Sequence, residues 1–376
     1  MSVDFSSRWV NCHVHTGVIA HNVATLARHV APSEVWVVVK ANGYGHGAVE
    51  VARAALSAGA TGLCVAIVDE GVALRRYGIT APILLLSEQP ADVADMVVGY
   101  MLTATVTTTR GAAALAAAAA SADLRAKVHV KVDTGMHRVG VSPGEALALA
   151  QFVRSHESLE IDGVYTHLAA AEMTDNPATA RQLGIFDEVV ATLAAHGITP
   201  RLVHAANSAG ALAHPESRRS LVRAGIAVYG LSAGAEVDGL ISGLVPALTL
   251  RARVSAVRWV EAGEAVSYGL RRPLKTSSLI ATVPIGYADG VPRRLGETDI
   301  PVLIGGVPRP IAGTVTMDQM LVDCGTDSSV TVGDEVVLIG RQGDNVVTAD
   351  QWADALGTIG YEIVCGISSR VHRTYQ

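Results

Sequence analysis

The chain has 376 residues, of which 49% are hydrophobic and 17% are charged. It is therefore long enough to bury a large core, and disorder of the whole chain is excluded. Its 35 acidic residues outnumber its 29 basic ones, which gives a net charge of −6. This balance argues against a nucleic acid as the main partner, because counterion release on a polyanion requires a basic face. Small anions are not excluded, since a single local site can bind a phosphate.

The cysteines and the N-terminus suggest a cytoplasmic protein. Cys12, Cys64, Cys324 and Cys365 are far apart and form neither a C-x-x-C motif nor a zinc spacing, so we expect reduced thiols and no metal site. The first 15 residues lack a basic start followed by an apolar run, so we expect no secretory signal. The alanine-rich run 111–122 is too short to span a bilayer, and we expect a helix and no membrane partner there.

Eight strand-like runs alternate with helical stretches over the first two thirds of the chain. The runs show little polar alternation, which is typical of parallel strands buried on both faces. The helical candidates between them are 48–58, 92–98, 111–120, 145–156 and 178–195. The strand-like runs are 36–40, 62–68, 83–87, 102–107, 128–133, 161–167, 202–208 and 221–229.

This repetition predicts a closed (β/α)8 TIM-type barrel, with an open doubly wound sheet as the alternative. After residue 236 the pattern changes to short strand-like runs separated by turns, at 247–257, 279–283, 302–304, 320–324 and 335–339, with one helix at 349–356. We therefore predict an α/β chain with a barrel over 1–236 and a mostly β domain over 237–376.

Polar residues stand where the predicted barrel strands end. In such barrels the carboxyl ends of the strands form the functional face. One such residue means little, but five strand ends with polar residues indicate a site. These residues are Lys40, Asp133 with Arg138, His167, Asn207 with Ser208, and Arg223 with Gly225 and Ile226.

Lys40 closes an apolar strand and precedes a glycine-rich loop. An uncharged lysine amine forms a Schiff base with an aldehyde, although a lysine that extends to solvent explains the position as simply. Ser208 and the small residues after Arg223 suit a phosphate at the usual phosphate site of a barrel, unless Ser208 only caps a helix. A ligand with both an aldehyde and a phosphate would be pyridoxal 5'-phosphate.

Nine motifs, spread over nearly the whole chain, resemble those of the alanine racemases, which are fold-type III pyridoxal phosphate enzymes. The resemblance is highly specific because the motifs occur together. They are the segments 37–47, 81–86, 131–140, 204–208, 223–230, 266–269, 286–290, 317–319 and 361–365.

The resemblance implies a role for each matching residue. Lys40 would bind the cofactor covalently and act with Tyr268 of the partner subunit as one of two bases. Arg223 would face the pyridine nitrogen, with His167 and His204 linking it to Tyr268, and Lys131 would orient Arg138 and is often carbamylated. The other implied cofactor-binding residues are Tyr44, Arg138, His167, Asn207, Ser208, Gly225, Ile226 and Tyr361. Substrate would contact Arg138, Tyr287, Met317 and Asp318, the last three from the partner subunit.

The implied activity is the interconversion of L-alanine and D-alanine by a homodimer with shared active sites, supplying D-alanine for peptidoglycan. The chain departs from the family pattern at Gly43, Thr314, Thr316 and His372, and the two threonines put side-chain selectivity in doubt. A broader-specificity racemase (of serine, for example), a decarboxylase of the same fold and a non-catalytic cofactor carrier are the alternatives. Arg223 argues against the decarboxylase, and the second domain with Tyr268 argues against the carrier. Taken singly, Tyr287 is equally explained as a core tyrosine, and a methionine such as Met317 more often packs than contacts a ligand. Lys131 is explained as well by an ion pair with Asp133 or Asp318.

Overall fold

The computed structural model describes residues 8–376, which form two compact units. One unit consists of Val18–Gly43 and Ala48–Val245. The other consists of the described residues up to Gly17, the short segment Tyr44–Gly47, and Pro246–Gln376. The division predicted between residues 236 and 237 stays a prediction. No helix of the part that the structure describes is both long and apolar enough to cross a membrane.

The first unit is built on eight parallel strands, one for each strand-like run predicted from the sequence. Most of their residues are fully buried on both faces, which explains the missing polar alternation. The strands are β2 (Glu34–Val38), β3 (Gly62–Val65), β4 (Ile83–Leu85), β5 (Ala104–Val106), β6 (Ala126–Lys131), β7 (Leu159–Tyr165), β8 (Leu202–His204) and β9 (Leu221–Ala224).

The eight strands close into a barrel. Their parallel pairing forms two groups, β4-β3-β2-β9 and β5-β6-β7-β8. A parallel bridge between Leu84 and Thr103 joins β4 to β5. Ser220 N donates to Val203 O at 3.0 Å, which joins β9 to β8. The predicted (β/α)8 barrel is therefore confirmed, and the open doubly wound sheet is excluded.

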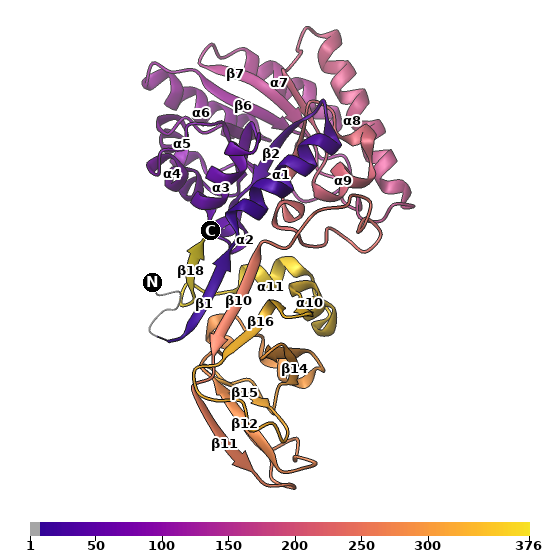
Figure 1. The fold of residues 1–376 in the computed structure, drawn as a ribbon. Helices are drawn as coiled ribbons and strands as arrows, with labels where there is room; N and C mark the ends of the chain where they lie inside the picture. Colours follow the sequence, from indigo (N-terminus) through magenta and orange to yellow (C-terminus); the bar gives the residue numbers. More distant parts are fainter. Residues whose placement is uncertain (1–7) are drawn as a thin grey trace. The chain divides into compact units, whose positions relative to one another are not determined.

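Helices lie outside the strands of this unit (Figure 1). The alanine-rich run forms part of α6, which begins where the Thr108 hydroxyl accepts from Gly111 N. Helices α1, α2, α4 and α9 were not among the predicted ones. The helices are α1 (Thr16–Val30), α2 (Lys40–Tyr44), α3 (Ala48–Ser57), α4 (Val68–Arg76), α5 (Ala94–Gly99), α6 (Thr109–Ser121), α7 (Ala146–Arg154), α8 (Pro177–Ala195) and α9 (Ser208–Ala213).

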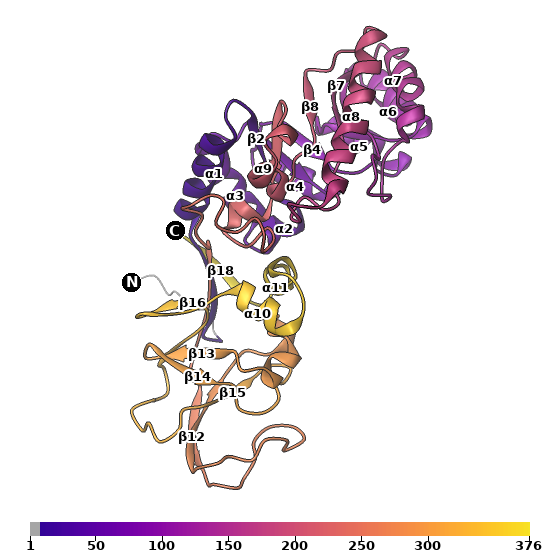
Figure 2. The ribbon, with the colours of Figure 1, turned by 90° about the vertical axis from the view of Figure 1, so that its right-hand side faces the viewer.

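The second unit is mostly β, as predicted. Its main sheet has the order β14-β13-β16-β10-β1-β18, with β17 on β16, and a smaller sheet has the order β11-β12-β15. The helices α10 (Ala349–Leu356) and α11 (Gly360–Gly366) pack against each other (Figure 2). The strands are β1 (Val10–Val14), β10 (Leu248–Arg253), β11 (Ala256–Val260), β12 (Ser278–Val283), β13 (Pro301–Ile304), β14 (Val307–Pro310), β15 (Met320–Asp323), β16 (Glu335–Gln342), β17 (Asn345–Val347) and β18 (His372–Tyr375).

Three local predictions differ from the structure. The run 247–257 forms two strands in different sheets, because the chain leaves the main sheet after Arg253. The run 221–229 ends as a strand at Ala224 and continues as a short 3-10 helix, Ile226–Tyr229. Strand β2 stops at Val38, so Lys40 begins a turn instead of closing a strand.

Candidate active site

A left-handed turn follows strand β2. Ala41, Asn42, Gly43 and Tyr44 all have φ between 51° and 62°. Three of these are not glycine, and such a conformation costs about 1–2 kcal/mol per residue. The turn is held by hydrogen bonds from Ala41 N to Glu70 Oε1 (2.6 Å) and from Ala48 N to Asn42 Oδ1 (3.0 Å). Strain that the surroundings maintain is typical of functional sites, and this one directly follows Lys40.

Positive groups gather at the carboxyl ends of the barrel strands. The pKa of the half-buried His167 is well below its ordinary value, because of desolvation and then of Arg223, Lys131, Arg138 and Lys40. An imidazole in this setting is neutral. Among the described residues, the side chains whose charges lower the pKa of His167 are all cationic, which favours an anionic ligand.

Lys131, at the end of β6, is buried, and the pKa of its amine is lowered. Its Nζ donates to Leu86 O at 3.0 Å and lies 5.3 Å from the centre of the Tyr165 ring. Burial, followed by the charges of Arg223, Arg138 and Lys40, lowers its pKa to about 8. The nearby Asp133 accepts the N–H groups of three residues that follow it, at 3.0–3.1 Å. Among the described residues neither Lys131 nor exposed Arg138 forms an ion pair.

Arg223 is buried, and both terminal nitrogens of its guanidinium face acceptors. Nη1 lies 2.7 Å from His204 Nδ1. Nη2 donates to Thr166 O at 2.9 Å and to Ala205 O at 2.8 Å, and lies 3.2 Å from His167 Nδ1. Within residues 8–376, Nε–H is the nitrogen of this group that makes no hydrogen bond. It is therefore a donor left over for a ligand.

Tyr165, which the sequence analysis missed, lies against His204 and Arg223. Its ring stacks on His204 with centres 4.6 Å apart, and the Arg223 guanidinium lies 5.1 Å from the ring centre. Its hydroxyl donates to Leu86 O and lies 2.8 Å from Thr105 Oγ1. The ring therefore fixes the orientation of both His204 and Arg223. A tyrosine at the end of a barrel strand was the signal available in the sequence.

The loops after β8 and β9 meet at Ser208. Its hydroxyl oxygen accepts from Gly225 N at 2.9 Å and from Ala227 N at 3.4 Å. The cap of α9 is Asn207, whose side chain accepts from Gly210 N, so Ser208 does not serve as the cap. The Ser208 hydroxyl proton and the N–H of Ile226, the first residue of its 3-10 helix, suit a phosphate.

In the second unit, Tyr44 and Tyr361 lie together, with ring centres 5.8 Å apart. Tyr268 is exposed, with 73% of its surface accessible. It stands on a strained loop, because Ser267 and Leu270 beside it have φ of 64° and 46°. Thr314 stabilises this loop by donating its hydroxyl to Tyr268 O at 3.0 Å.

Tyr287, Met317 and Asp318 lie on two adjoining turns of this unit. Tyr287 N donates to Thr316 O at 2.9 Å, and Ala288 N donates to Met317 O at 3.0 Å. The Tyr287 and Met317 side chains are exposed, so neither packs in the core of this unit.

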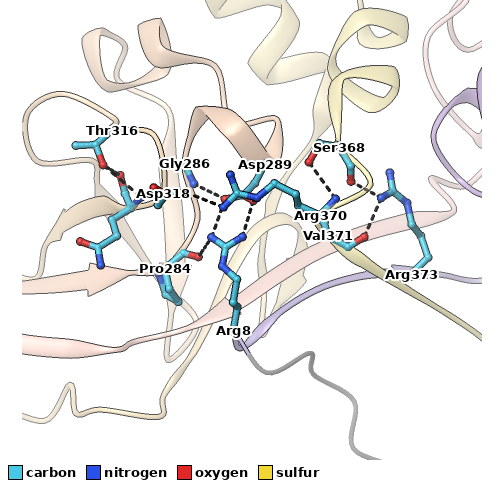
Figure 3. Close-up of polar contacts among 11 residues, drawn as sticks. Arg8, Pro284, Gly286, Asp289, Thr316, Asp318, Ser368, Arg370, Val371 and Arg373 are labelled. Atoms are coloured by element: carbon cyan, nitrogen blue, oxygen red, sulfur yellow. Dashed lines mark hydrogen bonds and ion pairs between the residues drawn. The ribbon is translucent and has the colours of Figure 1, made fainter.

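A buried carboxylate anchors both turns (Figure 3). Asp289 is fully buried and accepts from Arg8 Nη1 at 2.7 Å and from Gly286 N at 3.0 Å. Arg370 links it to the second turn, with Nε 3.3 Å from Asp289 and Nη2 2.6 Å from Asp318. The sequence analysis missed Asp289 and Arg370, although Asp289 lies inside one of the motifs.

Family models match the chain over most of its length. The model for "Alanine racemase, N-terminal domain" matches residues 14–233. The model for "Alanine racemase, C-terminal domain" matches residues 247–375. This chain belongs to the alanine racemase family.

Individual relatives agree with this assignment. The alanine racemase of Symbiobacterium thermophilum is 47% identical over 96% of this chain and 96% of that protein. The structure of alanine racemase from Bacillus anthracis with bound L-Ala-P has a TM-score of 0.92 and 38% identity, covering 98% of this chain and 95% of that one. Alanine racemase from D-cycloserine-producing Streptomyces lavendulae has a TM-score of 0.91 and 36% identity, covering 99% and 98%. The predictions of this family and of an isomerase are confirmed.

Proposed function

We propose that this protein interconverts L-alanine and D-alanine with pyridoxal 5'-phosphate, using Lys40 and the partner subunit's Tyr268 as the two bases. The observation that carries the proposal is Arg223, a buried guanidinium with an unused Nε–H among three other cationic groups. A charged arginine opposite the pyridine nitrogen discourages protonation of that nitrogen. Such a setting favours rapid return of the proton over transamination and decarboxylation.

The residues at the barrel face fit this cofactor. Arg138, Lys131 and Arg223 supply the positive charge that a phenolate and a phosphate require, and Ser208 with Ile226 supplies donors for the phosphate. Pyridoxal phosphate supplies the electron sink that makes the Cα proton of an amino acid removable. The full proposed set is Lys40, Tyr44, Arg138, His167, Asn207, Ser208, Arg223, Gly225, Ile226 and Tyr361.

The protein's own contribution is to remove a proton from one face of a carbon atom and to deliver a proton to the other face. Tyr268 takes the proton from the L isomer on one face, and Lys40 returns a proton on the other face to give the D isomer. In the reverse direction their roles exchange. Acid–base help of this kind contributes about 10²–10⁴-fold per group.

The substrate is held by residues of both subunits in this proposal. Arg138 and the partner's Tyr287, Met317 and Asp318 surround it, so the working unit is a homodimer. The exposure of Tyr268 and Tyr287 supports this, because large aromatic side chains at an accessible surface suit an interface.

Lys131 is proposed to orient Arg138, as the resemblance implies. A lysine whose pKa is lowered to about 8 has an appreciable neutral fraction at physiological pH. A neutral amine can react with carbon dioxide to form a carbamate, whose negative charge would then face Arg138. The supply of D-alanine to peptidoglycan and a location in the cytoplasm stay predictions.

The test of this function is direct. The purified protein should absorb near the visible region as a lysine-bound pyridoxal phosphate, lose this band on treatment with borohydride, and carry the reduced label on Lys40. L-alanine should lose its optical activity, and L-serine measured in the same assay tests the broader racemase. A protein that binds no pyridoxal phosphate, or that leaves L-alanine unchanged, would refute the proposal.

The Tyr268→Phe variant tests the two-base assignment. Phenylalanine keeps the ring and removes the acidic hydroxyl, so we expect loss of proton abstraction from L-alanine with the cofactor band retained. The loss should be at least about 100-fold in kcat. Normal turnover of L-alanine by this variant would be incompatible with Tyr268 as a base.

A further inference from the structure

Behind Arg223, two imidazoles and a carboxylate follow one another in the interior of the barrel unit. His204 Nδ1 lies 2.7 Å from Arg223 Nη1, and His204 Nε2 lies 2.9 Å from His129 Nδ1. His129 Nε2 lies 3.6 Å from Asp162 Oδ2 and has no closer hydrogen-bond acceptor among the described residues. Both histidines are fully buried, and Arg223 and Asp162 are 3% and 4% exposed. We call these four residues the Arg223 chain.

The two ends of the Arg223 chain fix where every proton lies. A guanidinium can only donate, so His204 Nδ1 must accept and a neutral His204 must carry its proton on Nε2. That proton is donated to His129 Nδ1, so His129 carries its own proton on Nε2. This proton points to Asp162, which can only accept when ionised. One pair of tautomers therefore satisfies both hydrogen bonds of the Arg223 chain and leaves the Nε2 proton of His129 facing Asp162 at 3.6 Å.

The charges around the chain support neutral imidazoles. Burial lowers the pKa of His204 and His129, and Arg223 lowers both further. The Asp162 carboxylate acts in the opposite direction on His129, but the pKa of His129 stays below its ordinary value. At the outer end, His129 and Arg201 hold the pKa of Asp162 well below its ordinary value. Arg201 lies 3.2 Å from this carboxylate and Lys127 lies 3.6 Å from it. The Asp162 carboxylate is therefore ionised in the folded protein at neutral pH.

The backbone is shaped to admit His129. Strands β6 and β7 pair with a register shift between Val128 and His129. Opposite the ring is Gly163, where a Cβ atom would lie only 2.7 Å from His129 Cε1 and Nδ1. Any other residue at position 163 would displace the ring. The register shift and Gly163 therefore both make room for the His129 imidazole.

We propose that His129 and Asp162 are positioning residues for Arg223. Through fixed tautomers, they keep Nδ1 of His204 as an acceptor, which holds the guanidinium with Nε–H as its free donor. This inference rests on the proposed function only in assigning that donor to the cofactor. Neither residue touches substrate or cofactor, and both act through His204.

The first test reads the tautomers in the wild-type full chain. Histidine is labelled with 15N, and the two ring nitrogens of His129 and His204 are observed by NMR with and without pyridoxal phosphate. We expect Nε2 protonated and Nδ1 unprotonated in both rings from pH 6 to pH 9. A proton on Nδ1 of either ring, or a charged imidazolium, would overturn the proposal.

The second test compares two substitutions at one position. Asn carries its amide oxygen close to where the histidine has Nδ1, so His129→Asn retains an acceptor for His204, whereas His129→Leu does not. In the Leu variant the Nε2 proton of His204 has no acceptor, so the tautomer that Arg223 favours is no longer supported from both sides. We therefore expect mixed tautomers in the His204 signals and about tenfold weaker binding of pyridoxal phosphate. The Asn variant should stay within about twofold of the wild type.

The outcomes separate this inference from the proposed function. If the Leu variant matches the wild type both in cofactor affinity and in the His204 signals, the positioning role is wrong although the racemase proposal stands. If the wild-type protein binds no pyridoxal phosphate, the proposed function fails, while the NMR measurement still decides the tautomers. Circular dichroism confirms that each variant is folded, and the wild-type measurement needs no variant.

Discussion

At the scale of single residues, Thr314 forms a hydrogen bond with the backbone of Tyr268, one of the two proposed bases. Its hydroxyl donates to the carbonyl of Tyr268, and the Ser267 hydroxyl donates to Thr314 O at 2.6 Å. These two bonds hold a loop whose backbone is left-handed on both sides of Tyr268. The sequence analysis associated Thr314 with selectivity for the substrate side chain. The structure adds a bond to the loop that carries Tyr268.

Replacing Thr314 by Val should therefore disturb Tyr268 while preserving volume. We expect kcat to fall about tenfold, because the Tyr268 carbonyl loses its partner in this partly buried bond. The deuterium isotope effect should increase for Cα-deuterated L-alanine, from which Tyr268 takes the proton. Thr314→Ser retains the hydroxyl and is the matched control, and equal behaviour of the two variants would contradict the role of this bond.

The charge of the buried Lys131 lowers the free energy of unfolding, because burial disfavours the charged amine. Its folded pKa of about 8 lies below the unfolded value near 10.4. Between these two values the unfolded chain binds more protons, so this group makes stability rise with pH there. Below pH 8 both states are protonated, and the folded state bears the full cost of burying the charge.

Lys131→Met should accordingly stabilise the cofactor-free protein at pH 7. The gain should approach about 3 kcal/mol and shrink as pH rises from 8 towards 10.4. Urea unfolding at pH 7 and pH 9.5 in buffer free of carbon dioxide measures both values. Lys275→Met, at an exposed position, is the control and should change neither. A gain of the same size at both pH values would show that the charge is not responsible.

At the scale of elements, the turn over Gly286–Gly290 and the segment around Met317 form one assembly. Asp289 caps the first turn and Arg370 connects it to Asp318 (Figure 3). The two segments approach so closely that a Cβ atom at Gly286 would lie 2.2 Å from Thr316 O and 2.5 Å from Met317 O. The positions of Tyr287, Met317 and Asp318 therefore depend on one another.

Gly286→Ala should separate these two segments. Overpacking against backbone atoms cannot be relieved by a side-chain rotation, so we expect a loss of about 1–3 kcal/mol in stability. The KM for alanine should increase, because the proposed substrate residues are displaced. Gly366→Ala, whose Cβ would meet no atom within 4 Å, provides the control in the same unit. An unchanged KM in a destabilised Gly286→Ala protein would separate this turn from substrate binding.

At the scale of the whole molecule, the proposed site is divided between two compact units of the chain. Lys40 belongs to the barrel unit, and Tyr268 belongs to the mostly β unit. The proposal of shared active sites requires that these two residues meet between subunits. A homodimer would then contain two complete sites.

Mixing two inactive variants tests this division. Lys40→Ala and Tyr268→Phe subunits should each be inactive alone, but a mixed dimer has one site with both wild-type residues. Unfolding and refolding the two together at equal amounts should restore about one quarter of wild-type activity, since half the dimers are mixed and each has one working site. No recovery, with mixed dimers demonstrated by differently tagged subunits, would place both residues of a site in one chain.

The amino-acid sequence by itself predicted the eight barrel strands, the β-rich second part and helix 349–356. Buried parallel strands and turn residues leave local signals in composition, and these do not depend on distant contacts. The candidate site residues came mainly from motifs, because Lys40 or Ser208 alone had simpler explanations. Strand ends such as Val38 were placed less well, since the left-handed turn after it depends on Glu70 and Asn42.

Only the tertiary structure revealed how the site residues are supported. Tyr165, His129 and Asp162 lie on neighbouring strands, far from Arg223 in sequence, and Asp289 meets Arg8 from the other end of the chain. Hydrogen bonds, burial and pKa shifts arise from distances between such residues, which the order of amino acids does not state. The sequence therefore determined the family and the architecture. The fold decided which protons and charges face one another, because these interactions extend over only a few ångströms.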